Sequence, residues 1–337
     1  MYLYHRVPKG GIKMERIFKY RDKVIKSGGK TILCGIVNVT PDSFSDGGKW
    51  FDTEKAIEHG LELVKQGATM LDVGGESTRP GATNKVDVQD EIDRVVPVIK
   101  GLKERTDVLI SIDTWKSEVA KAAIDAGVDI INDITGMLGD PNMGRVVGDS
   151  DVGVVAMFNP VILRPEHKSS KAFMKLGGDG VFTKEEEESA MSDPIVDSCK
   201  MYFKKTLDVA KENNIAKERI MLDPGIGFGL TKRENLELIK NFKFIHDWNM
   251  FAFIGVSRKR FIVNILEEGG FNVDSNTAEG FTNRDDGSAA LTSIAAVMGA
   301  EALRVHVIPR HKIAADIADA VRMAEETEDI NFEAYKK

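Results

Sequence analysis

Short apolar runs and longer amphipathic stretches alternate along this chain. Each run is continuously apolar, so its pattern favours a strand buried on both faces, as in a parallel sheet that helices cover. The predicted strands are 31–37, 69–73, 108–112, 128–132, 152–158, 219–223, 251–256 and 302–306.

Helical periodicity fills the intervals between these strands. The predicted helices cover 53–66, 89–105, 116–125, 193–214, 232–241, 285–299 and 310–327. In the first of them, Ala56, Ile57 and Leu61 recur near helical spacing, with Thr53 as the expected N-cap and Gly67 as the stop. A strand followed by a helix, repeated around the chain, favours a single α/β (β/α)₈ TIM barrel. An open doubly wound sheet is the structural alternative.

Some segments lie outside the repeating units of one strand and one helix. The predicted organisation is an N-terminal extension (1–30), a barrel (31–327) with a long insertion after the fifth strand (159–192), and a C-terminal tail (328–337). A polar, glycine-rich stretch at 267–283 is a further irregular segment. Within the insertion, the charge run Lys184 to Glu188 is typical of a solvated surface.

Composition narrows the class of protein. The 337 residues carry a net charge of −7, which argues against a nucleic-acid footprint over the whole chain. Two cysteines, Cys34 and Cys199, are too few for a disulfide framework or a zinc cluster, and they suit a reducing compartment. Neither a membrane-spanning apolar stretch nor a secretory signal is recognisable. We therefore expect a cytoplasmic protein without a nucleic-acid or membrane partner.

Polar side chains stand at the carboxyl ends of the predicted strands. A single such residue is more often a turn former or a helix cap. Acids, amides and bases at many strand ends, however, are the pattern of a barrel active site. They are Asn38, Thr78, Arg79, Asp113, Asn132, Asp223, Lys259, Arg304 and His306.

The chemistry of these residues indicates the kind of ligand. Asp113, Asn132 and Asp223 supply hydrogen-bond acceptors, and the amide also supplies donors. This set suits a heterocycle rich in N–H groups, such as an aminopyrimidine or a pterin. The cationic residues on neighbouring strands, with Thr78 and Arg79, suit an anion such as phosphate.

The motifs at the strand ends resemble those of dihydropteroate synthase. They follow the family's order over about residues 31–325 and read NVTPDSFSDGG (38–48), GGESTRPGA (74–82), SIDT (111–114), IND (131–133), DPGIGFG (223–229), SRK (257–259) and RVH (304–306). The resemblance implies a TIM-barrel transferase of folate biosynthesis, a family targeted by sulfonamides. Such an enzyme joins 6-hydroxymethyl-7,8-dihydropterin diphosphate to p-aminobenzoate and releases pyrophosphate through a cation-like transition state. The resemblance also implies a homodimer that pairs through the last helices.

The resemblance also assigns roles to individual residues, with Asp113 and Lys259 as the catalytic pair. The pterin-binding residues would be Asp113, Asn132, Met157, Asp223 and Lys259. The diphosphate would be held by Thr78, Arg79, Arg304 and His306. The walls of the p-aminobenzoate pocket would be Phe44, Pro80, Phe228 and Lys259. Asn38 would contact Mg²⁺, the one implied cofactor.

Some positions depart from the family pattern. Phe158 stands where a histidine is common, Arg260 where a serine is common, and Val307 where an aspartate is usual. Phe158 and the long insertion fall near the expected substrate pocket, so substrate preference could differ.

Two other functions remain open. A non-catalytic pterin-binding paralogue would account for Phe158, Val307 and the long insertion. A methyltransferase acting from methyltetrahydrofolate to a corrinoid would share the ring acceptors but would have no use for the diphosphate cations. Arg304, His306 and the loop after Asn38 count against this methyltransferase.

Overall fold

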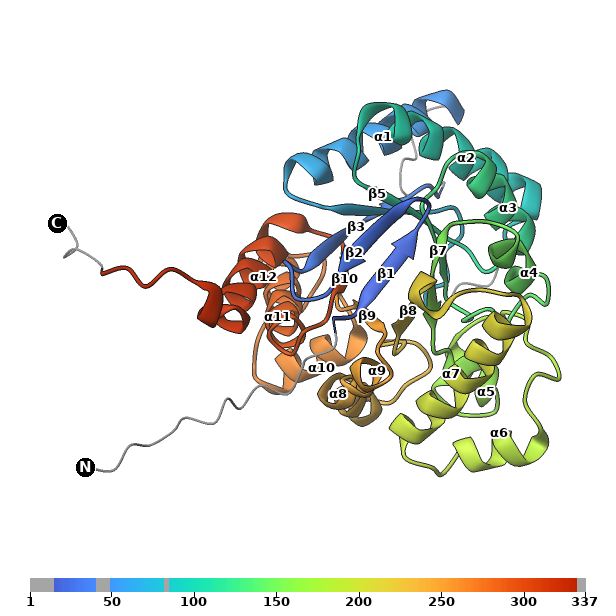
Figure 1. Cartoon of the computed structure of the whole chain (residues 1–337). Helices are drawn as coiled ribbons and strands as arrows, with labels where there is room; N and C mark the ends of the chain where they lie inside the picture. The colour runs from blue at the N-terminus through green and yellow to red at the C-terminus, as the bar shows by residue number, and fades with distance from the viewer. Residues whose placement is uncertain (1–14, 41–48, 82–84, 332–337) are drawn as a thin grey trace, which may run out of the picture.

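Eight parallel strands close into a barrel (Figure 1). The computed structural model describes residues 15–40, 49–81 and 85–331. The barrel runs in the order β10-β3-β4-β5-β6-β7-β8-β9. Its strands are β3 (Ile32–Asn38), β4 (Met70–Gly74), β5 (Leu109–Asp113), β6 (Ile130–Asp133), β7 (Gly153–Met157), β8 (Ile220–Asp223), β9 (Phe251–Gly255) and β10 (Ala302–Val305). The predicted TIM barrel is confirmed, and each strand lies within two residues of its predicted run.

Helices surround this barrel. They are α1 (Lys49–Lys65), α2 (Val88–Arg105), α3 (Ser117–Asp125), α4 (Met143–Gly148), α7 (Ile195–Glu212), α8 (Lys232–Asn241), α9 (Phe244–Asp247), α10 (Arg260–Glu268), α11 (Ala278–Val297) and α12 (Ile308–Arg322). Among the described residues, none of the helices combines the length and the apolar character needed to span a membrane.

Two helix starts differ from the sequence-based expectation. Thr53 lies inside α1, which begins at Lys49, so its prediction as the N-cap was wrong. The helix expected from residue 285 begins instead at Ala278, where the Thr277 side chain accepts a hydrogen bond from the Gly280 N–H. In α11 the apolar periodicity starts later than the helix, because its first turns are largely polar.

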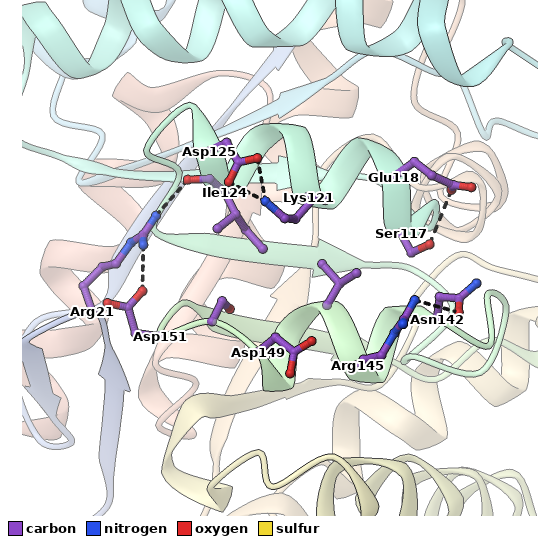
Figure 2. A pocket seen from close by; sticks show the side chains of 12 residues that line it. Arg21, Ser117, Glu118, Lys121, Ile124, Asp125, Asn142, Arg145, Asp149 and Asp151 are labelled. Carbon is purple, nitrogen blue, oxygen red and sulfur yellow. Dashed lines mark hydrogen bonds and ion pairs between the residues drawn. The ribbon is translucent and has the colours of Figure 1, made fainter.

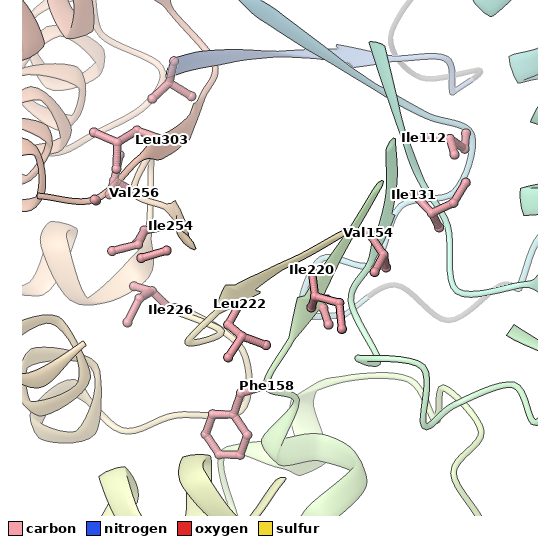
Figure 3. Close-up of a cluster of buried hydrophobic side chains, with 14 of the residues drawn as sticks. Ile112, Ile131, Val154, Phe158, Ile220, Leu222, Ile226, Ile254, Val256 and Leu303 are labelled. Atoms are coloured by element: carbon pink, nitrogen blue, oxygen red, sulfur yellow. The ribbon is translucent and has the colours of Figure 1, made fainter. Parts of the chain in front are cut away.

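The strands are apolar at successive positions because both of their faces are buried. Outward side chains pack in the layer that the helices cover, as Figure 3 shows for Ile112, Ile131, Val154, Leu222, Ile254 and Leu303. Inward side chains near the amino ends of the strands form a second cluster of Cys34, Met70, Ile130, Val155, Met221, Phe251, Phe253 and Ala302. This interior cluster fills the lower barrel, so polar groups can meet only nearer its carboxyl end.

A hairpin from the N-terminal extension covers the amino end of the barrel. Its strands, β1 (Ile17–Tyr20) and β2 (Lys23–Lys26), pair antiparallel. Phe18 is fully buried in the interior cluster, with its ring centroid 5.9 Å from that of Phe251. Arg16 pairs with Glu301 just before β10, at 2.6 Å. The hairpin thus caps one end of the barrel and leaves the carboxyl end for ligands.

The insertion after β7 has secondary structure of its own. It contains α5 (Pro160–Leu163), a 3₁₀ turn (Ser170–Ala172) and α6 (Lys184–Ala190). The acidic run lies on α6, where Thr183 and Glu186 form a capping box. Most of its side chains are exposed, as expected for a solvated surface.

Candidate active site

Strand register brings the predicted polar residues to one rim of the barrel. Asn38 is opposite Gly74, and Gly74 is opposite Asp113. Asp113 is opposite Asn132, and on the other side of the barrel Met157 is opposite Asp223. Because neighbouring parallel strands end at the same edge, these side chains converge on one mouth.

A buried carboxylate, Asp72, forms the centre of this mouth. It accepts hydrogen bonds from the Ser111 hydroxyl, from Asn132 Nδ2 at 3.0 Å and from Arg304 Nε at 2.5 Å. Asp72 was missed in the sequence reading because it sits inside an apolar run. The available signal was its position two residues after Met70 and two before Gly74, which turns its side chain toward the barrel interior.

Arg304 joins Asp72 to Asp113. Its Nη2 donates a hydrogen bond to Asp113 Oδ2 at 2.6 Å, while its Nε donates to Asp72. Burial raises the pKa of Asp113 above the usual range, and the neighbouring Asp72 charge adds to this, whereas Arg304 opposes it. The guanidinium predicted to hold diphosphate is therefore also the counter-ion of two barrel carboxylates.

Asp223 presents one unused acceptor to the cavity. Its Oδ1 accepts from the Gly225 N–H at 2.8 Å, and no described residue donates to Oδ2. Burial raises the pKa of Asp223 to about 6. A ligand that offers N–H donors to this carboxylate would stabilise its ionised form.

Lys259 is positioned by the residue before it. Arg258 has a left-handed backbone, with φ of 56°, which a non-glycine residue adopts only when its surroundings hold it there. Its N–H donates to Ser288 Oγ at 2.9 Å, and its guanidinium binds both oxygens of Asp285 at 2.8 and 3.2 Å. These contacts with α11 fix the turn from which the next side chain enters the mouth.

The ammonium group of Lys259 lies 5.1 Å from the ring centroid of Phe228. Burial lowers its pKa to about 8. Gly227 makes this approach possible, because a Cβ at that position would lie 2.6 Å from Lys259 Cδ. The glycines of the DPGIGFG motif thus serve the placement of Lys259 as well as the turn itself.

His306 lies among cations. Its ring Nδ1 is 3.0 Å from Ser257 Oγ. Burial lowers the pKa of His306 far below its usual value, so the ring is neutral at pH 7, and nearby positive charges lower it further. These charges belong to Arg258, Arg304, Lys259 and Arg79. Such a concentration of positive charge suits an anionic ligand.

The loop after β4 carries three further predicted residues. Thr78 is half-buried, while Arg79 and Pro80 are exposed. The loop is anchored through Glu76, which accepts from the Val86 N–H at 2.7 Å and from Trp115 Nε1 at 2.9 Å. Phe44, predicted for the p-aminobenzoate pocket, lies outside the described residues.

Phe158 does not line the mouth. It is fully buried in the layer between the barrel and the helices, and its ring makes edge contacts with Tyr202 at 5.3 Å and Phe203 at 6.5 Å. The expectation that Phe158 affects the substrate pocket directly was therefore wrong. Met157, the preceding residue, points the other way and packs with Ile134 and Leu176.

Asn38 is compatible with a bound magnesium ion. It ends β3 at the mouth, half-buried, and its side-chain amide has no hydrogen-bond partner among the described residues. In the same residues no cluster of three or more His, Cys, Asp or Glu side chains could hold a metal by itself. Mg²⁺ often takes one or two protein oxygens together with substrate phosphates and water, so a single amide oxygen fits that use.

A separate cavity of about 890 Å³ lies on the outside of the barrel between α3 and α4 (Figure 2). Charged side chains on its walls pair with one another, including Arg21 with Asp151 and Lys121 with Asp125, both at 2.6 Å. None of the predicted site residues lines this cavity. The candidate site is therefore the barrel mouth.

Comparison with known proteins agrees with this geometry. The family model described as "Pterin binding enzyme" matches residues 34–306. A dihydropteroate synthase from Streptococcus pyogenes serotype M6 is 36% identical over 278 residues, which are 82% of this chain and 91% of the relative.

Two solved structures are similar over nearly the whole chain. One is dihydropteroate synthase from Clostridium difficile in the presence of pteroic acid, with a TM-score of 0.72 and 36% identity over 88% of this chain and 98% of that one. The other is the Xanthomonas albilineans enzyme with 4-aminobenzoic acid, with a TM-score of 0.73 and 34% identity over 92% and 99% of the two chains. The chain therefore belongs to the dihydropteroate synthases, transferases of the pterin-binding enzyme family.

Proposed function

We propose that this chain joins 6-hydroxymethyl-7,8-dihydropterin diphosphate to p-aminobenzoate and releases pyrophosphate. The proposal rests on one observation: hydrogen-bond acceptors and positively charged side chains lie together at the same barrel mouth. Acceptors on Asp113, Asn132 and Asp223 suit the N–H edge of a pterin. The positive charges around His306 suit the diphosphate that the same substrate carries.

The reaction needs charge stabilisation and positioning more than an activated nucleophile. The amine nitrogen forms a bond to the pterin methylene carbon while the bond from that carbon to the diphosphate oxygen breaks. The diphosphate leaves with the bonding electrons, and the amine nitrogen gives its proton to solvent. Arg304 and Arg79 stabilise the departing negative charge, and Asp113 stabilises the electron-poor pterin. An arylamine is neutral at pH 7, so it needs orientation in the pocket.

Asn38 and the diphosphate together would hold Mg²⁺, which would supply further neutralisation of the leaving charge.

Lys259 has two neighbours in this scheme. It approaches Asp223 closely enough for each to influence the pKa of the other, and its ammonium group lies over Phe228, a proposed wall of the amine pocket. It can therefore help to hold the pterin and face the carboxylate of p-aminobenzoate.

A binding experiment tests whether the mouth can hold a pterin and a diphosphate at the same time. Hydroxymethylpterin without its diphosphate and inorganic pyrophosphate should bind simultaneously, one of each per chain, in isothermal titration calorimetry with Mg²⁺. Joint binding is expected because Asp223 lies near the positively charged side chains around His306, which are Arg79, Arg258, Lys259 and Arg304. Mutually exclusive binding, or no binding of pyrophosphate, would count against the proposal and favour a pterin site without a diphosphate clamp.

The pH dependence of turnover should be bell-shaped. Asp223 must be ionised to accept from the pterin, and its raised pKa of about 6 places the acid limb there. Lys259 must be protonated to attract anions, and its lowered pKa of about 8 places the alkaline limb there. We therefore expect kcat/KM for the pterin substrate to fall below about pH 6 and above about pH 8. A profile that is flat from pH 5 to pH 9 would remove both groups from the reaction.

We also propose that the chain forms a homodimer through α11 and α12. Ile313, Ile317 and Val321 are spaced four apart on α12 and are each more than 60% exposed. Ile294 and Val297 add exposed apolar area on α11. A second copy of this face would remove the stripe from water.

Replacing Ile317 by glutamate should weaken self-association at least about tenfold, because the dimer would have to bury a charge. Analytical ultracentrifugation over a concentration series measures this change. Leu236→Glu, on an exposed apolar residue of α8, is the matched control and should leave association unchanged. A monomeric wild-type chain at high micromolar concentration would contradict the dimer.

We propose the cytoplasm as the compartment of this enzyme. Cys34 and Cys199 are both free and buried, which suits a reducing environment.

The alternative of a non-catalytic paralogue loses some support, because Phe158 lies in the core and takes no group away from the mouth.

A further inference from the structure

The insertion after β7 is fixed firmly to the rim of the active site. Arg164, only 2% exposed, binds Glu234 of α8 with both arms of its guanidinium, at 2.7 and 2.8 Å. It also donates to the carbonyl of Gly229 at 3.2 Å. At the start of the insertion, Asn159 donates to the Ile134 carbonyl at 2.8 Å. A buried, two-pronged ion pair of this kind holds a segment in one position.

The middle of the insertion bridges two loops of the mouth. The Ala172 carbonyl accepts a hydrogen bond from the Gly81 N–H at 2.9 Å, which ties the insertion to the loop carrying Pro80. The next residue, Phe173, stacks on Phe228 with centroids 5.6 Å apart and planes 27° apart. The insertion therefore contacts the loops that carry two of the proposed walls of the amine pocket.

The same segment reaches the wall of the pterin pocket. Leu176 is buried with Met157 and Ile134, and Met174, Phe228 and Trp115 all pack against this cluster. Phe228 thus has an aromatic neighbour from the insertion as well as the Lys259 ammonium group, 5.1 Å from its centroid. Without Phe173, the Phe228 ring would lose the partner that restricts its orientation.

We propose that Phe173 is a specificity-determining residue for the arylamine substrate. By stacking on Phe228 it fixes the ring that the amine packs against and narrows the pocket on the side of the insertion. The proposal rests on the proposed function, because it assumes that an arylamine occupies the space between Pro80, Phe228 and Lys259. It predicts that Phe173 acts on binding of the amine and not on the chemical step.

The test compares Phe173→Ala with the wild-type enzyme at saturating pterin diphosphate. Pyrophosphate release is followed with p-aminobenzoate and with a bulkier amine, 4-amino-1-naphthoate. Loss of one aromatic contact should raise KM for p-aminobenzoate about threefold to tenfold and leave kcat within about twofold. The preference for p-aminobenzoate over the naphthoate should fall, because the pocket widens. Phe173→Tyr should restore both values, and Met191→Ala, an exposed position on the same insertion, should change neither.

Calorimetric binding of p-aminobenzoate, in the presence of pterin and pyrophosphate, separates this proposal from the proposed function. Unchanged KM and Kd in folded Phe173→Ala would overturn the role of Phe173, as would a fall in kcat alone. If the wild type binds p-aminobenzoate without turning over, the proposed reaction fails and the comparison of Kd values still decides the role of Phe173. If the wild type neither binds nor converts the amine, both proposals fail.

Discussion

Replacing Asp223 by asparagine should lower the affinity for hydroxymethylpterin at least about thirtyfold. The substituted amide can keep the hydrogen bond from the Gly225 N–H through its oxygen. Its NH₂ group would then face the pterin donors in place of the unused carboxylate oxygen. Loss of a charged partner in a desolvated site costs about 2–5 kcal/mol, which sets the expected size of the effect.

Isothermal titration calorimetry with the pterin alone measures this loss. Asp208→Asn, on an exposed aspartate of α7, is the matched control and should bind the pterin as the wild type does. Thermal unfolding should show that the Asp223 variant remains folded, because the turn keeps its backbone contact. An affinity within twofold of the wild type would place the pterin elsewhere.

Replacing Arg304 by glutamine should reduce the free energy of unfolding by about 3–5 kcal/mol. Arg304 donates to Asp72 through Nε and to Asp113 through Nη2, so its loss removes the cation that is hydrogen-bonded to both carboxylates. Affinity for pyrophosphate should fall in the same variant, since one of the positive charges at the mouth is removed.

Urea unfolding at several pH values tests the structural half of this prediction. Arg304 lowers the pKa of Asp113, so without this cation the pKa of Asp113 in the folded state rises further. Protonation of Asp113 at low pH then relieves the repulsion between the two carboxylates. The difference in the free energy of unfolding between the variant and the wild type should therefore shrink as the pH falls from 7 to 5. Asp72→Asn combined with Arg304→Gln should recover part of the lost stability. A loss of stability below about 1 kcal/mol at pH 7 would show that Arg304 is not the structural counter-ion of these two carboxylates.

Most of the barrel could be predicted from the sequence because its strands are buried on both faces. Continuous apolar runs such as 251–256 have few structural explanations once helical stretches separate them. The N-terminal hairpin was not predicted, since its second strand, Lys23–Lys26, is mostly exposed and carries little periodicity. The start of α11 was missed for a related reason, because its first turns are polar and depend on the Thr277 cap.

The candidate site could be predicted where a polar residue ends a strand. Asp113 and Asp223 are the last residues of β5 and β8, and Asn132 is the last but one of β6. Asp72 does not follow this rule, because it lies within its strand, and its partnership with Arg304 joins residues 232 positions apart. The contact of Phe173 with Phe228 likewise depends on how the insertion folds back, which no local pattern in the sequence specifies.

The central claim is that one mouth binds the pterin and the diphosphate of a single substrate and transfers the pterin to an amine. The most direct measurement is mass spectrometry of a reaction containing dihydropterin diphosphate, p-aminobenzoate, Mg²⁺ and a small amount of the enzyme. The account predicts 7,8-dihydropteroate and pyrophosphate in equal amounts, exceeding the enzyme many times over, with no dihydropteroate when the amine is omitted. Absence of dihydropteroate with a folded, pterin-binding chain would contradict the claim and leave a pterin-binding protein without this reaction.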